Sequence, residues 1–271
     1  MSHFTVAVIH HKNQDIEELL APYNENLEVE RYIYKTKEQI IQEAYDKADN
    51  IRYRVKHGDT DDMVFPYDNN FLEAFTDEEM YRVALAYEGI DADGDSDRLD
   101  ADGNWTSTYN PKSKWDWYSI GGRWGGMLKM PRDKVPAEWL EYMKDNDEYW
   151  ETDSAPIGCI DFSPDKDVYD EHYKWWVENV DDPDAEWNEF YRKEYYASYY
   201  KNAEDYATRC AQFSTFAVVT PDGVWHERGR MGWFACVDDT PEDSADWDAN
   251  YHKFIEEAEP EDIMTIVDCH I

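Results

Sequence analysis

The sequence predicts an α+β fold, in which a mainly antiparallel sheet is covered by acidic, aromatic-rich helices. Apolar, β-branched runs lie near both ends of the chain and in its middle, as expected for one sheet assembled from distant segments. Stretches with helical spacing and capping residues lie between these runs. A chain of 271 residues can bury one sizeable core, so we expect a single domain over residues 1–271.

The expected strands are short and rich in β-branched and aromatic residues. Phe4–Ile9 is an apolar run of strand length, and Ile263–Ile271 provides a last strand of the same character. Residues 213–228 predict a hairpin whose turn is Thr220–Gly223. The central segment 106–130 is also strand-like, and its four glycines predict a bend or bulge beside its tryptophans.

Three places carry the sequence signature of a helix start. Thr36–Gln39 and Thr76–Glu79 each place Thr three residues before Gln or Glu, which is the pattern of a capping box. Thr240–Pro241 combines an N-cap residue with proline at the first helical position, and predicts a helix to about Glu257.

The segment 164–208 is acidic and aromatic and is expected to be helical. Aromatic residues recur there at every fourth position: Trp187, Tyr191, Tyr195 and Tyr199. Because a helix turns once in about 3.6 residues, these rings share one face. The face either packs on the protein's own core or forms a ridge that binds a partner. Trp187, Tyr191 and Tyr195 are therefore candidate binding residues.

Residues 89–104 are rich in Asp and Gly and predict an exposed acidic loop. Four carboxylates fall at positions 1, 3, 5 and 12 of a calcium-loop pattern: Asp91, Asp93, Asp95 and Asp102. Ser96 stands where that pattern has glycine, and Asp102 replaces its bidentate Glu. The loop is either solvated or a site for Ca²⁺ or Mg²⁺, and no cofactor is otherwise required.

A second group of polar residues is expected to meet at one end of the sheet. The candidates for catalysis are Asp116, Arg123, Asp268 and His270, with His10 and Asp161 as further neighbours. Asp268 and His270 share a face of the last strand because strand side chains alternate, and such a pair suits acid–base catalysis or metal binding. The candidates for binding are Trp115, Trp117, Trp124 and Arg228. The alternative is a structural Asp116–Arg123 ion pair beside a fully hydrogen-bonded histidine.

The formal charge is −36, from 62 acidic and 26 basic residues, in a chain that is 16% aromatic. The aromatic rings favour a folded protein over an acidic disordered one. A strongly negative field repels nucleic acid and anionic membranes, and attracts basic protein surfaces. The sequence contains no run of signal-peptide or membrane-span length, so we expect a cytoplasmic protein whose four cysteines are free.

Four blocks occur in a characteristic order: SHFTVAVI, KWDWYSIGGRWGG, DGVWHERGRMGWFA and VDCHI. In these blocks the chain resembles a family of proteins encoded by tailed phages and prophages. The resemblance covers the whole chain in outline and implies a phage or mobile-element origin in a bacterial host cell. It carries over no catalytic residue.

These observations predict an accessory protein that binds and inhibits a basic, nucleic-acid-handling or defence protein of the host. Its carboxylates would imitate the phosphate array of a duplex. One alternative is an enzyme or binder that acts on a small nucleotide-like molecule in a pocket lined by Trp, Asp, Arg and His. Another alternative is a calcium-stabilised interaction module. The oligomeric state stays open.

Overall fold

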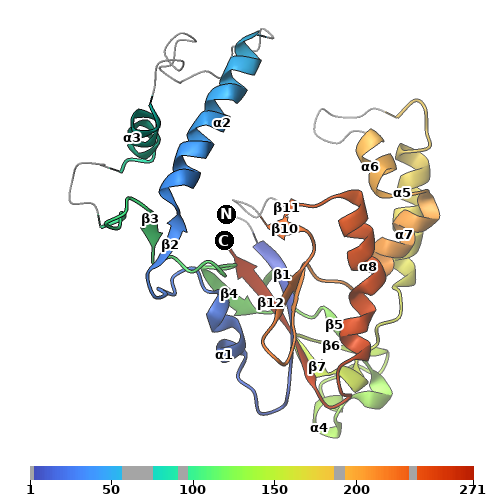
Figure 1. Ribbon diagram of the computed structural model, residues 1–271. Coiled ribbons are helices and arrows are strands. Elements are labelled where there is room, and N and C mark those ends of the chain that lie inside the picture. Colours follow the sequence, from blue (N-terminus) through green and yellow to red (C-terminus); the bar gives the residue numbers. More distant parts are fainter. Residues whose placement is uncertain (1–2, 57–75, 91–96, 186–192, 232–236) are drawn as a thin grey trace. The chain divides into compact units, whose positions relative to one another are not determined.

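The protein was analysed as a computed structural model, which describes residues 3–56, 76–90, 97–185, 193–231 and 237–271. Two compact units divide the chain: residues 1–27 with 111–271 form unit 1, and residues 28–110 form unit 2. The fold is α+β with a mainly antiparallel sheet, as the sequence predicts (Figure 1).

Unit 1 is built on a sheet with the order β4-β12-β1-β8-β9, and β7 also pairs with β12. Its strands are β1 (His3–His10), β4 (Trp117–Ile120), β7 (Ser154–Pro156), β8 (Ala217–Val219), β9 (Trp225–Glu227) and β12 (Ile263–His270). β1 and β12 lie side by side at the centre and run antiparallel along their whole lengths (Figure 1). The pair β1–β8 is parallel, and the remaining pairs are antiparallel. The predicted first and last strands and the predicted hairpin are confirmed.

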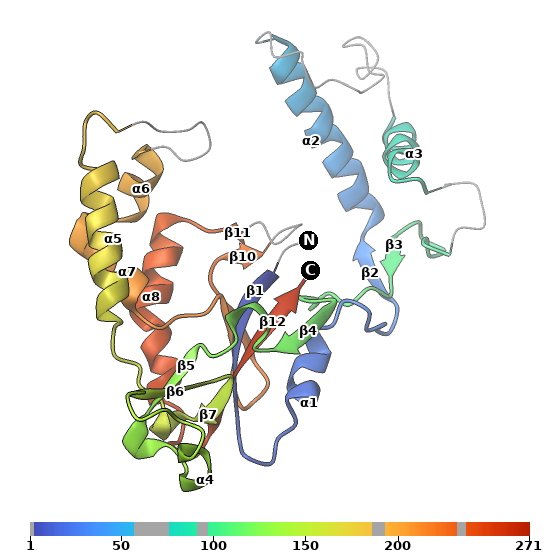
Figure 2. The ribbon, with the colours of Figure 1, turned by 180° about the vertical axis from the view of Figure 1, so that it is seen from behind.

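The two faces of this sheet bury different partners. One face, here called the α8 face, packs Ala7, Ile9 and Ile266 against Tyr251 of α8 (Pro241–Glu256). The opposite face packs alternate residues of the same strands against α1 (Ile16–Leu20) and the indole of Trp115. Figure 2 shows α8 and α1 on either side of the strands. Because both faces are covered, β1 and β12 are almost continuously apolar in their middle.

Further elements surround the sheet in unit 1. They are η1 (Ala21–Tyr23), η3 (Gly122–Trp124), β5 (Leu128–Pro131), η4 (Arg132–Lys134), α4 (Ala137–Leu140), β6 (Tyr149–Thr152), η5 (Ile157–Cys159), α5 (Lys166–Asn179), α6 (Lys193–Tyr199), α7 (Ala203–Ala211), β10 (Arg230–Met231) and β11 (Val237–Asp238). α5 and α7 pack together around Trp176 and Tyr206, whose ring centroids lie 5.3 Å apart.

Unit 2 contains β2 (Tyr32–Lys35), α2 (Lys37–Lys56), α3 (Asp77–Tyr87) and β3 (Trp105–Ser107). β2 and β3 form an antiparallel pair. The helices α2 and α3 pack on each other around Ile40, Tyr81 and Leu85, and Trp105 covers this small core. Unit 2 therefore has a hydrophobic cluster of its own.

The predicted helix starts are confirmed by their hydrogen bonds. Thr36 and Gln39 bond reciprocally, with the Gln39 N–H 3.2 Å from Thr36 Oγ1 and the Thr36 N–H 2.8 Å from Gln39 Oε1. Thr76 forms a complete capping box at α3, and Thr240 forms one at α8 with proline in the first turn. Each box satisfies backbone donors that a helix leaves open at its N-terminus.

Candidate functional site

The α8 face changes from apolar to polar at one end of the central strands. The register pairs His3 with His270 and Thr5 with Asp268, and it also pairs His270 with Trp117 of β4. Alternate residues of a strand share a face, so these side chains continue the rows that contain Ala7, Ile9, Met264 and Ile266. The strand pairing therefore brings polar and aromatic side chains from distant segments of the chain together at this end of the sheet.

Two carboxylate–imidazole pairs stand side by side at this end, and we call them the His–Asp pairs. His3 Nδ1 lies 2.7 Å from Asp268 Oδ1, and His270 Nδ1 lies 2.6 Å from Asp116 Oδ1. The side chains of His270 and Asp268 are only 7% and 3% exposed. The two imidazole rings meet edge to face, with centroids 5.1 Å apart. In each pair the carboxylate can fix both the orientation and the tautomer of its imidazole.

Both carboxylates are themselves positioned by backbone donors. Asp268 Oδ2 accepts the Arg123 N–H at 3.0 Å, and Asp116 Oδ1 accepts the Trp117 N–H at 2.8 Å. Gly122 precedes Arg123 with φ of +53°, and a Cβ at Gly122 would collide with the Asp268 side chain. The bend that the glycines predict is therefore confirmed, and it brings a backbone amide onto a buried carboxylate.

The second ring nitrogen of His270 has no hydrogen-bond partner in the part of the chain that the structure describes. Among the residues that the structure describes, His270 Nε2 and Arg228 Nε are the buried side-chain atoms without a hydrogen bond. The indole of Trp117 stacks on the His270 ring at 5.0 Å and 18°, and its edge meets His3 at 5.3 Å. Trp117 is 45% exposed, so the stack also offers apolar surface to solvent. A buried nitrogen without a hydrogen bond calls for a partner that the described residues do not supply.

This arrangement can perform acid–base chemistry. When Nδ1–H donates to the carboxylate, the neutral imidazole keeps its lone pair on Nε2 and can accept a proton. Two such imidazoles in contact can act as one base and one acid. The same pattern also orients metal-ligating histidines, but the described residues contain no cluster of three His, Cys, Asp or Glu side chains that could hold a metal ion.

The other residues of the predicted catalytic and binding groups differ in how close they lie to the His–Asp pairs. Asp116 pairs with His270, whereas Arg123 reaches Asp268 through its backbone N–H and is otherwise exposed. Trp115 is 5% exposed and donates its indole N–H to the Leu20 carbonyl at 3.2 Å. Trp124 is half-buried against the core of the α8 face.

The remaining candidates lie apart from the His–Asp pairs or outside the described residues. Tyr195 is 51% exposed on α6, with its ring centroid 4.6 Å from that of Tyr199, as the four-residue spacing predicts. Asp161 bonds Ser163 and Tyr149. Asp102 is exposed. The candidates that fall outside the described residues are Asp91, Asp93, Asp95, Trp187 and Tyr191.

Sequence reasoning missed His3. It lies one residue before the expected first strand, Phe4–Ile9, and two positions before Thr5. Pairing that strand antiparallel with the last one places an N-terminal histidine close to Asp268 and His270. The signal was therefore present, but only the pairing of the two strands and their register reveal it.

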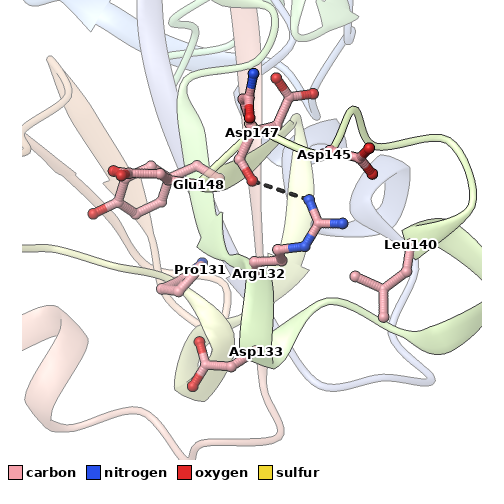
Figure 3. Close-up of a pocket in the computed structure, with 9 residues that line it drawn as sticks. Pro131, Arg132, Asp133, Leu140, Asp145, Asp147 and Glu148 are labelled. Atoms are coloured by element: carbon pink, nitrogen blue, oxygen red, sulfur yellow. Dashed lines mark hydrogen bonds between the residues drawn. The ribbon is translucent and has the colours of Figure 1, made fainter.

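An open cavity of about 810 Å³ lies elsewhere, beside β5 and the segment that leads to β6 (Figure 3). Arg132 is surrounded there by Asp133, Asp145 and Asp147. Its Nη1 donates to the carbonyls of Lys144 at 2.8 Å and Asp147 at 3.1 Å, so the guanidinium is held by the protein. This cavity contains neither His–Asp pair.

No protein-family model, no curated protein and no solved structure matches the chain. Within the described ranges, the helices are too short or too polar to cross a bilayer.

Proposed function

We propose that the protein binds a small nucleotide-like molecule at the His–Asp pairs and acts on it by acid–base chemistry. The observation that carries the proposal is the buried His270 Nε2, which lacks a partner while Asp116 holds Nδ1 at 2.6 Å. An unsatisfied buried polar group costs about 1–3 kcal/mol. A purely structural histidine gains nothing from that penalty, whereas a catalytic one gains an available base.

The two pairs divide the work of one reaction. One neutral imidazole removes a proton from an attacking hydroxyl or water, and the other, protonated, donates a proton to the leaving oxygen. Such a sequence accomplishes hydrolysis or transesterification of an ester. The His3 and His270 rings are in contact, so a small substrate bound at one imidazole would lie close to the other. Trp117, stacked on His270 and half-exposed, offers an indole for a nucleobase.

The experiment compares two buried histidines. Wild-type protein, His270→Gln and His10→Gln are incubated with nucleoside monophosphates, cyclic nucleotides and dinucleotides, and products are separated chromatographically. We expect turnover of one substrate class by wild type and His10→Gln, and a loss of 10²–10⁴-fold in His270→Gln. Equal turnover by all three proteins, or no binding of any compound by the wild type, would contradict the proposal.

A second candidate function is supported by the charge of −36. In this proposal the acidic surface binds a basic, nucleic-acid-binding protein of the host and inhibits it, and the resemblance to phage proteins supports such a role. Binding should weaken as salt rises, because screening shortens the range of the field. Capture of partners from host lysate at low and high salt tests this candidate, and a partner indifferent to salt, or tight binding to duplex DNA, would contradict it.

A further inference from the structure

We propose that Arg228, in a cavity lined by Thr5, the strand partner of Asp268, holds a phosphate group of the substrate. The inference deepens the proposed function and rests on it for the identity of the substrate. It begins from Arg228 Nε, the second buried side-chain atom without a hydrogen bond in the described part of the chain.

The backbone places Arg228 in line with the His–Asp pairs. Asp268 faces Thr5 across the central pair of strands. Thr5 Oγ1 accepts the Phe216 N–H at 3.2 Å, and the Phe216 carbonyl accepts the Arg228 N–H at 2.9 Å. Thr5 follows His3 by two residues on the α8 face. The row therefore runs from the buried carboxylate of one His–Asp pair to Arg228 at the end of β9.

A cavity of about 330 Å³ opens over this row. Thr5, Ser214 and Arg228 line it, with Arg209 and Cys210 of α7 on another side. It is therefore bounded by polar groups of the sheet end and by a helix that packs nearby. Its volume is sufficient for a phosphate group with part of the molecule that carries it.

Arg228 is the arginine of this cavity whose side chain makes no hydrogen bond to the described residues, although it forms an ion pair with Asp239. Arg209 is engaged by the protein: Nε donates to Asp248 at 2.5 Å, Nη1 to the Tyr199 carbonyl at 2.7 Å and Nη2 to Ser244 at 2.8 Å. Arg228, by contrast, has Asp239 Oδ2 at 3.5 Å from Nε without a hydrogen bond. A guanidinium recognises phosphate through two parallel N–H donors, so a fork that one carboxylate approaches without a hydrogen bond can still bind phosphate in a polar cavity.

The other reactive side chain of the cavity does not compete with this role. Burial raises the pKa of the Cys210 thiol to about 11. The thiol is therefore neutral near pH 7, and it is neither an anion that would neutralise Arg228 nor an activated nucleophile. The carboxylate of Asp248 already accepts from Arg209. Each arginine of the cavity thus has one carboxylate partner, Asp239 for Arg228 and Asp248 for Arg209, and only the Arg209 pair is hydrogen-bonded.

The test measures the binding of inorganic phosphate by calorimetry at fixed ionic strength, for wild type, Arg228→Gln and Arg132→Gln. The two variants remove the same charge, and Arg132 lies in the separate cavity of Figure 3. We expect Arg228→Gln to raise the Kd at least tenfold and Arg132→Gln to change it less than twofold. Arg228→Lys keeps the positive charge beside Asp239 and is therefore the control for a loss of folding. It should raise the Kd for phosphate several-fold, because lysine lacks the planar pair of N–H donors. Equal affinities in all four proteins, or no phosphate binding by the wild type, overturn the inference.

A second measurement separates this inference from the proposed function. If nucleotide turnover requires His270 while Arg228→Gln leaves KM and phosphate affinity unchanged, the phosphate subsite is wrong and the acid–base site stands. If phosphate binding requires Arg228 while no nucleotide is turned over, the acid–base function is wrong and the subsite stands.

Discussion

Two buried histidines lie at opposite ends of the same pair of strands, and their hydrogen bonds differ. His10 has both nitrogens engaged: Nδ1 lies 3.1 Å from the His11 carbonyl and Nε2 lies 3.2 Å from Thr265 Oγ1. The Thr265 hydroxyl also bonds Ser154 at 2.8 Å, which completes a closed network. His270 has one nitrogen on a carboxylate and the other unpaired. Both histidines are buried, so the completeness of their hydrogen bonding to the described residues, rather than burial, distinguishes them.

The chemical nature of the Nδ1 partner sharpens this difference. A backbone carbonyl can only accept, so His10 carries its proton on Nδ1 and Nε2 accepts from the Thr265 hydroxyl. Asp116 also accepts from Nδ1, but it places a carboxylate rather than a neutral carbonyl beside the ring. Of these two histidines, His270 is therefore the one that has a carboxylate on Nδ1 and an Nε2 that no described residue engages.

The largest expected effect follows from Asp116→Asn. An amide can bond either tautomer of His270 and removes the charge that stabilises the protonated ring, so we expect kcat to fall about 10²–10⁴-fold with the fold retained. Circular dichroism and turnover of the substrate identified for the wild type would be measured together. Unchanged turnover would place His270 in the same class as His10.

The next effect concerns the glycine that holds Asp268. Gly122→Ala forces a Cβ against Asp268 in a left-handed backbone, so we expect a loss of about 2–4 kcal/mol in unfolding free energy. Gly89→Ala is the control, because Gly89 has φ of +67° and nothing within 4 Å of the added Cβ. It should cost about 1–2 kcal/mol, the backbone strain alone. If chemical denaturation gives the same loss of unfolding free energy for both variants, the side chain of Asp268 is not tightly packed against Gly122.

A smaller effect concerns pH. A reaction that uses one neutral and one protonated imidazole requires a mixed protonation state, so kcat/KM of the wild type should fall on both sides of an optimum, by up to about tenfold per pH unit. His10→Gln should keep the shape of this profile. A value of kcat/KM that does not change with pH would rule out catalysis by the two paired histidines.

The smallest effect is the stability cost at His10. His10→Gln removes at least one of the two bonds of the closed network and should lower the unfolding free energy by about 1 kcal/mol. Denaturant titration measures this cost. A loss of turnover in this variant at temperatures where it is folded would contradict the assignment of His10 to structure.

Local signals in the sequence predicted much of the fold. The apolar runs of β1 and β12 and the capping residues Thr36, Thr76 and Thr240 each act within a few residues, so each element could be located separately. The turn at Gly122 was expected from its composition, although which backbone amide it would present was not.

The candidate site was only partly predictable because it depends on register. His3 and Asp268 are 265 positions apart, and a shift of one residue would move either side chain to the opposite face. The structure brings Asp116 and Arg123 to Asp268 and His270, as the sequence predicts. The alternative of an Asp116–Arg123 ion pair is not what forms: Asp116 pairs with His270, and the Arg123 N–H bonds Asp268. The charges of these side chains limit which residues can pair, but the strand register determines which of them do.

The central pairing of β1 with β12 also links the site to the order of synthesis. A nascent chain displays β1 long before Asp268 and His270 have been made, so no shorter translation product can possess either His–Asp pair. In the meantime β1 is an apolar strand with unpaired edges, which invites association with other chains. β8 emerges earlier than β12 and pairs with β1 on the other side. The parallel pairing with β8 can therefore cover one edge of β1 until β12, which carries Asp268 and His270, has been synthesised.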